Sequence, residues 1–307
     1  MKNSRFHILG FISSIMKNQK AKIGIYIFSF FILASIFAPL LVSSPTDYVG
    51  VPLDPPSMKF WFGTNGQGQD VFAQTIHGAR KTLFIAVLSG LLVVMVGAII
   101  GGVAGYFGGR FDDFLSLLIN VFLLLPGLPL MVILAAWLPP GPLTIIMVLV
   151  FTGWAWHARV LRSQVMAFRK QDFVYASKVC GESNFRIITV EILPRMLSLI
   201  TSSFIGATIY GIGAQVGLEF LGLGDISQVT WGTNLYWATN DLALLTGSWW
   251  TFVPTGISIA LVSLSLTLIN FGIDEIANPR LISERYLSNK LGKSYDRNSV
   301  TPVRMDS

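Results

Sequence analysis

TLFIAVLSGLLVVMVGAIIGGVAGYF, Thr82–Phe107, is a run of 26 residues without one charged side chain. About 20 apolar residues are enough for a helix to cross the ~30 Å hydrocarbon core of a bilayer. A helix is the structure that satisfies all its backbone hydrogen bonds within a single span. The run therefore predicts a transmembrane helix and places the chain among integral membrane proteins.

Five further stretches have the same character, and with Thr82–Phe107 they predict six transmembrane helices. They are Ile23–Val42, Phe114–Leu138, Leu143–Val165, Met196–Phe220 and Trp250–Phe271. The composition agrees, because 52% of the 307 residues are hydrophobic and 12% are charged, whereas a soluble domain is about 25% charged. We therefore predict an all-α integral membrane protein.

Basic residues predict how these helices are oriented. Lysine and arginine precede the first span, surround the loop 166–195 and follow the last span, whereas Leu221–Trp249 contains none. Because cytoplasmic loops carry the excess of Lys and Arg, we expect both termini and the loop 166–195 to be cytoplasmic and 221–249 to be external. The predicted parts are a cytoplasmic segment 1–22, a helix 23–42, an external loop 43–81, a core 82–276 with five spans, and a basic cytoplasmic tail 277–307.

Glycines and prolines predict details of the spans. Gly97, Gly101, Gly105 and Gly109 recur every four residues, starting in the second span. That spacing would put them on one helix face, where a neighbouring backbone can approach closely. We predict a helix-packing seam, either static or able to slide, with static packing the simpler interpretation. In the third and sixth spans, Pro126 and Pro254 each predict a kink.

The loop DFVYASKVCGESNFRIITVEILP, Asp172–Pro194, predicts two short helices joined by a turn. Gly181 can end the first helix in the left-handed conformation. Ser183 or Asn184 can cap the second helix, and Pro194 would mark the turn into the fifth span. Four apolar side chains would then form a contact surface that suits a protein partner, or alternatively lie on lipid headgroups. They are Phe173, Tyr175, Val179 and Phe185.

The same loop resembles the EAA loop of binding-protein-dependent ABC importer permeases, E-A-A-x3-G-x9-I-x-L-P. Ala176, Gly181, Leu193 and Pro194 match this pattern, while Tyr175 stands in place of the usual Glu. In that family the loop is the docking site of a separate ATPase subunit. The resemblance therefore implies a set of ATPase-docking residues. They are Phe173, Tyr175, Ala176, Ser177, Gly181, Glu182, Leu193 and Pro194.

A second stretch of sequence limits the resemblance to a smaller group of these permeases. FGTNGQGQDVFAQTIHGAR, Phe62–Arg80, resembles the G-T-D-x2-G-R-D-x3-R-x4-G-A-R signature of the dipeptide, oligopeptide, nickel and opine permease group. AGYFGGRFDD, Ala104–Asp113, and LEFLGLG, Leu218–Gly224, are similar to further blocks of that DppC/OppC-like class. The resemblance covers about residues 20–285. It implies the type I ABC importer permease (MetI-like) fold, with 82–276 as the core permease domain.

The resemblance also implies partners and excludes an enzyme. We expect a permease subunit in a bacterial or archaeal cell (inner) membrane, paired with a second homologous permease, two cytoplasmic ABC ATPases and an external substrate-binding protein. Besides these proteins we expect contact with the lipid bilayer and none with nucleic acid. ATP and Mg would bind to the ATPase partners, leaving no cofactor or metal in this chain. Gly292-Lys293-Ser294 lacks the earlier glycine that a phosphate-binding loop requires.

The sequence is compatible with more than one class of substrate. The resemblance implies oligopeptides or dipeptides, with oligosaccharides of β-glucoside type as the first alternative and a non-translocating scaffold subunit as the second. A secondary transporter, which needs ionisable residues for ion coupling, ranks last. Near the outer edge we expect gate or substrate contacts from Glu219, Trp231 and Trp237, with Glu219 reaching water or a cation. The aromatic residues could equally form an interfacial belt.

Overall fold

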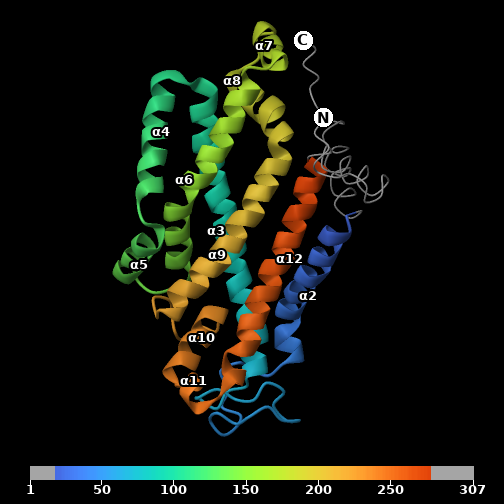
Figure 1. Ribbon diagram of the computed structural model, residues 1–307, viewed down its shortest axis with the longest axis vertical. Coiled ribbons are helices and arrows are strands. Elements are labelled where there is room, and N and C mark those ends of the chain that lie inside the picture. Colours follow the sequence, from blue (N-terminus) through green and yellow to red (C-terminus); the bar gives the residue numbers. More distant parts are fainter. Residues whose placement is uncertain (1–17, 278–307) are drawn as a thin grey trace, which may run out of the picture.

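Long apolar helices dominate the computed structural model, which describes residues 18–277 (Figure 1). Five helical segments are long and apolar enough to cross a membrane, and a bent pair of helices makes a sixth candidate. The long helices are α2 (Gln19–Leu41), α3 (Val71–Phe107), α6 (Pro142–Arg169), α9 (Leu197–Phe220) and α12 (Val253–Ala277). The structure thus confirms the all-α membrane fold.

Helix α3 begins at Val71 and not at Thr82, so residues 71–81 of the segment predicted as an external loop are helical. The side chain of Asp70 caps the helix by accepting a hydrogen bond from the backbone N–H of Phe72 at 2.9 Å. With 37 residues, α3 is about 55 Å long, whereas the hydrocarbon core is ~30 Å thick. The helix is therefore longer than a single span requires.

The third predicted span, Phe114–Leu138, is wrong as a single helix. It is divided into α4 (Gly109–Leu124) and α5 (Gly127–Trp137), which meet at 87°. The break falls at Leu125 and Pro126, because proline restricts the residue before it and lacks a backbone donor. The predicted break at Pro126 is confirmed, and it is a sharp turn of the chain.

The kink predicted at Pro254 is wrong. Helix α12 starts at Val253, so Pro254 lies in the first helical turn. The first N–H groups of a helix have no acceptor within it, so a proline there removes no hydrogen bond.

The glycine seam is confirmed at three of its four positions. A Cβ added at Gly97 would lie 2.9 Å from the Cβ of His157, and one at Gly105 would lie 2.7 Å from the backbone oxygen of Arg162. Gly101 is equally tight against Ala158. All three glycines therefore let the backbone of α3 pack closely on α6, and this contact forms the centre of the bundle.

Gly109 does not belong to this seam. Helix α3 ends at Phe107, and Gly108 and Gly109 both have positive φ, at 67° and 58°. A Cβ at Gly109 would meet no atom of the described residues within 4 Å. Its role is to begin α4 after a reversal of the chain, which a four-residue spacing cannot distinguish from a further helical turn.

The two ends of the bundle are built from different segments. Helices α7 (Asp172–Val179) and α8 (Asn184–Arg186) lie at one end, whereas α10 (Trp231–Asn240), α11 (Ala243–Thr246) and the loop 43–70 lie at the other (Figure 1). This arrangement agrees with the prediction that 166–195 and 221–249 face opposite sides. The predicted N-terminal segment up to residue 17 and the tail from residue 278, with Gly292-Lys293-Ser294, lie outside the described residues.

Candidate functional site

The two-helix loop at one end of the bundle forms as its residues predict. Helix α7 (Asp172–Val179) is followed by Gly181 at φ 77°, whose N–H donates to the carbonyl of Lys178 at 3.0 Å. Ser183 then caps α8 (Asn184–Arg186) by accepting from the N–H of Arg186 at 3.3 Å. The left-handed turn at Gly181 sets the angle between the two helices.

Pro194 does not mark a turn, so that prediction is wrong. From α8 the chain stays helical through a π-helical segment, η1 (Ile187–Ile192), and a 3₁₀ segment, η2 (Leu193–Met196), into α9. Pro194 occupies an early position of the 3₁₀ segment, where the hydrogen-bond pattern changes and the missing N–H of proline is tolerated. A short loop, α7 to α8, therefore stands directly on a long helical segment.

The tip of this loop is apolar and exposed. Tyr175, Val179 and Phe185 are exposed by 56%, 89% and 78%, and Ala176 beside them is exposed as well. Exposed apolar side chains grouped at one place mark an interaction site. Glu182 forms an ion pair with Arg186 at 3.0 Å next to this tip.

Phe173 differs from the other apolar residues of the loop. Its side chain is half-buried beneath Arg195, whose guanidinium carbon lies 3.8 Å from the ring centroid. Ser177 is also half-buried, and its hydroxyl donates to the carbonyl of Phe173, one turn earlier in the same helix, at 2.9 Å. Phe173 and Ser177 are therefore less exposed than Tyr175 and Ala176, with which the prediction grouped them in one docking set.

A cluster of buried side chains fixes the base of the loop to the bundle. It joins the loop to α3, α6 and the start of α9, so the exposed tip stands on a rigid support. Its members are Tyr106, Leu161, Val165, Val174, Ile187, Ile192 and Met196.

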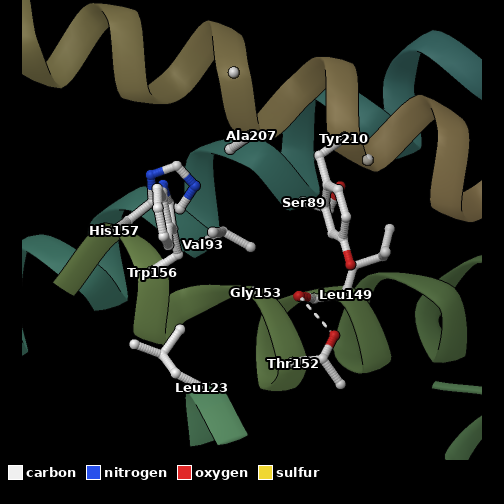
Figure 2. A pocket seen from close by; sticks show the side chains of 12 residues that line it. Ser89, Val93, Leu123, Leu149, Thr152, Gly153, Trp156, His157, Ala207 and Tyr210 are labelled. Carbon is white, nitrogen blue, oxygen red and sulfur yellow. Dashed lines mark hydrogen bonds between the residues drawn. The ribbon is translucent and has the colours of Figure 1, made fainter. Parts of the chain in front are cut away.

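A cavity of about 400 Å³ opens on the side of the bundle between α3, α4, α6 and α9 (Figure 2). Apolar side chains make most of its wall, and Tyr210 reaches from α9 toward α6 (Figure 2). Polar groups come from Ser89, Thr152, His157 and Tyr210. His157 is the only ionisable side chain besides Tyr210 among the lining residues, so the wall is nearly uncharged.

The sequence analysis did not assemble this cavity, because its residues come from four separate segments. A polar or ionisable side chain within a membrane span normally faces a protein interior or a water-filled space. His157 and Tyr210 lie within long apolar helices, and this is the sequence signal that points to the site. Trp156 and Tyr210 are exposed by 60% and 50%, so the cavity is open on one side.

Glu219 at the other end of α9 is buried, and among residues 18–277 it reaches neither open solvent nor a cation, contrary to prediction. The side chain is 4% exposed and accepts hydrogen bonds from Gln215 Nε2 at 3.0 Å and Thr230 Oγ1 at 2.6 Å. Amide and hydroxyl donors therefore compensate its burial. Through its bond to Thr230, which caps α10, Glu219 connects α9 to the start of α10.

Trp231 is fully buried, so it cannot stack on a substrate as predicted. Its indole Nε1 donates to the carbonyl of Thr75 at 2.9 Å, and its backbone N–H donates to the hydroxyl of Thr82 at 3.0 Å. Both acceptors belong to α3. This tryptophan therefore attaches α10 to the N-terminal part of α3.

Trp237 is half-buried beside a pocket of about 140 Å³. All other polar side chains around this pocket are neutral amides or hydroxyls, and they come from the loop 43–70, from α3 and from the segment around α10. They are Thr46, Gln67, Gln69, Gln74, Ser227, Gln228, Thr233 and Asn234. Within residues 18–277 no group of three His, Cys, Asp or Glu residues is placed to hold a metal ion.

Known proteins resemble this chain over most of its length. A family model described as "Binding-protein-dependent transport system inner membrane component" matches residues 93–283. The chain is 35% identical to the dipeptide transport system permease protein DppC of Bacillus subtilis (strain 168), over 87% of this chain and 84% of that relative. It is 32% identical to the oligopeptide transport system permease protein OppC of the same organism, over 86% of this chain and 87% of that relative.

A third similar protein comes from another genus. The DppC permease protein of Alkalihalophilus pseudofirmus is 32% identical, over 88% of each chain. The apolar spans, the two-helix loop and these alignments agree, and the chain therefore belongs to the family of membrane permease subunits of binding-protein-dependent transport systems.

Proposed function

We propose that this permease subunit forms half of the translocation pathway of an ATP-driven importer for oligopeptides or dipeptides delivered by an external binding protein. The relatives that support the peptide substrate carry dipeptide and oligopeptide transport in their names. The observation that carries the proposal is the exposed apolar tip of Tyr175, Val179 and Phe185 on a rigid base. Such a tip suits a protein that binds from one side of the membrane.

The partner at this tip would be one of two ABC ATPases, which would bind ATP and Mg. The permease itself would carry no cofactor and perform no hydrolysis. The open side of the 400 Å³ cavity would face a second, homologous permease, because the polar groups of His157 and Tyr210 are costly to expose to lipid. Substrate would then pass between the two permeases.

The proposed orientation has the tip in the cytoplasm of a bacterial or archaeal cell and Ser227 outside. Cys180 is the one cysteine of the chain and is exposed in the two-helix loop. A membrane-impermeant maleimide should leave Cys180 unlabelled in intact cells and label it after permeabilisation. A Cys180→Ser, Ser227→Cys variant should be labelled in intact cells, and the opposite pattern would refute the orientation.

Transport is tested in liposomes that contain the permease pair, both ATPases and the cognate binding protein. We expect ATP-dependent uptake of a labelled oligopeptide, with no uptake when the permease is omitted. Accumulation without ATP would contradict the proposal, and a complex that binds all partners but imports nothing would favour a scaffold subunit.

One observation favours a second substrate class. The pocket beside Trp237 is lined by neutral amides and hydroxyls, and an aromatic face with neutral hydrogen-bonding groups also suits a sugar ring. Excess cello-oligosaccharide should leave oligopeptide uptake unchanged if peptides are the substrate. If the sugar blocks uptake while unlabelled peptides do not, the oligosaccharide importer is the correct assignment.

A further inference from the structure

Tyr106, next to the last residue of α3, touches both helices of the two-helix loop. Its hydroxyl donates to Asn184 Oδ1 at 2.8 Å, and Asn184 is the first residue of α8. Its ring lies 5.3 Å from the Nζ of Lys178, which belongs to the last turn of α7. The side chain is 3% exposed and belongs to the buried cluster beneath the loop.

The opposite part of α3 is bonded just as directly to the outer end. The carbonyl of Thr75 accepts from the indole of Trp231, and the carbonyl of Gln74 accepts from Asn234 Nδ2 at 3.2 Å. Both donors belong to α10. One continuous helix therefore contacts α10 near its start and the two-helix loop at its end.

The fit of α3 against α6 makes this connection rigid. Close packing at Gly97, Gly101 and Gly105 leaves no room for a side chain between the helices. Gly105 is the neighbour of Tyr106, so the position of the phenol is set by the backbone contact beside it. A displacement of α10 relative to the bundle would thus reach the loop through α3.

We propose that Tyr106 is the positioning residue through which α3 couples the two-helix loop to the external end of the permease. This role rests on the proposed function, in which the loop binds an ATPase. The exposed docking residues Tyr175, Val179 and Phe185 would bind the partner, whereas Tyr106 would control how the bound ATPase responds to the substrate-loaded binding protein.

The test uses the complete complex in liposomes and separates binding from coupling. In Tyr106→Phe the ring remains and the hydrogen bond to Asn184 is lost. We expect the ATPase subunit to co-purify as with the parent and basal ATP hydrolysis to persist. Stimulation of hydrolysis by the loaded binding protein, and uptake with it, should fall about three- to ten-fold, which corresponds to the loss of one neutral hydrogen bond.

Two variants of Asn184 test whether the hydrogen bond from Tyr106 is itself responsible for the effect. Asn184→Asp keeps an acceptor for the phenol and should retain stimulation, whereas Asn184→Leu removes it and should match Tyr106→Phe. Combining Tyr106→Phe with Asn184→Leu should add little to either loss, because both remove the same contact. Tyr26→Phe, at a tyrosine of α2 that is 60% exposed, is the control for losing a phenol hydroxyl and should behave as the parent.

Unchanged stimulation in Tyr106→Phe would overturn the proposal. So would a loss that follows a loss of ATPase co-purification, because Tyr106 would then only support the docking surface. If the parent complex neither binds ATPases nor imports substrate, the proposed function itself fails. A working parent with an unaffected Tyr106→Phe variant rejects the coupling role alone.

Discussion

The two ends of this permease differ in which side chains they expose and which they bury. The two-helix loop exposes apolar side chains, with Tyr175, Val179 and Phe185 at its tip. The opposite end, around α10, buries polar ones, such as Glu219 and Thr230, within hydrogen bonds of the same chain. An exposed apolar tip is completed by a partner, whereas buried polar groups that bond to one another, as Glu219 and Thr230 do, depend on the fold of the chain itself. Changes at the first end should therefore impair assembly or coupling, and changes at the second should impair folding.

The strongest test of this comparison is Gly181→Pro. Proline fixes φ near −65° and has no N–H, whereas Gly181 has φ 77° and donates to Lys178. We expect uptake and binding-protein-stimulated ATP hydrolysis to be abolished while the permease still inserts in the membrane. Gly181→Asn, which tolerates the left-handed conformation, should retain most activity. Normal stimulated hydrolysis in the proline variant would contradict a role of this turn.

Trp231→Ala should show the opposite behaviour. Removing a fully buried tryptophan costs about 3–5 kcal/mol, and here the hydrogen bond to Thr75 is lost as well. We expect less folded permease and a lower unfolding temperature in detergent, measured by the change in near-UV circular dichroism. Trp249→Ala, at a tryptophan that is 54% exposed, is the matched control and should leave stability almost unchanged. Equal stability of both variants would remove the distinction between the two ends.

Glu219→Gln gives a smaller and more specific effect. One carboxylate oxygen becomes an NH₂ group that faces a donor, and an unsatisfied buried polar group costs about 1–3 kcal/mol. Stability should fall by this amount in chemical denaturation, while Glu182→Gln at the exposed ion pair with Arg186 should change little. Remaining uptake should not depend on the proton gradient at constant ATP. Loss of uptake by the parent on collapse of the gradient alone would favour secondary transport.

The smallest expected effect concerns pH at Asp241, which accepts a hydrogen bond from the N–H of Gly66 at 2.9 Å. Burial raises the pKa of this carboxyl above its ordinary value of 3.8, and the bond from Gly66 partly opposes the shift. A raised pKa in the folded state gives a stabilising contribution that is fully present below the unfolded pKa and is lost as pH rises through the folded one. Asp241→Asn should therefore flatten the acidic part of the stability curve, as followed by unfolding temperature against pH. An identical curve for both proteins would show that Asp241 has no such influence.

Local patterns in the sequence predict much of the fold. The apolar runs predict every long helix, and Gly181 and Ser183 predict the two-helix loop, because these features depend on neighbours along the chain. The start of α3 at Val71 was missed because its first three turns are less apolar than a membrane span. Pro194 was misread as a turn because π and 3₁₀ segments leave no clear signature in the sequence.

The sites were harder to predict because they depend on contacts between distant segments. Trp231 reads like an interfacial aromatic residue, and only its contacts with Thr75 and Thr82 identify it as buried. Glu219 likewise finds its partner Thr230 in the following segment. The cavity with His157 and Tyr210 requires four helices to be placed at once. Residue type is enough to select these positions as candidates, but the burial and the contacts of each side chain determine what it does.

The helical segment between the loop and α9 has a mechanical consequence. In η1 and η2 the backbone changes from a wide π turn to a tight 3₁₀ turn within ten residues, Ile187–Met196. A mid-helix change of this kind often marks a hinge or a strained sequence, but Ile187, Ile192 and Met196 are buried in the cluster beneath the loop. The direction in which α8 leaves α9 is therefore fixed by packing, and the link to α3 through Tyr106 holds the same loop from its other side.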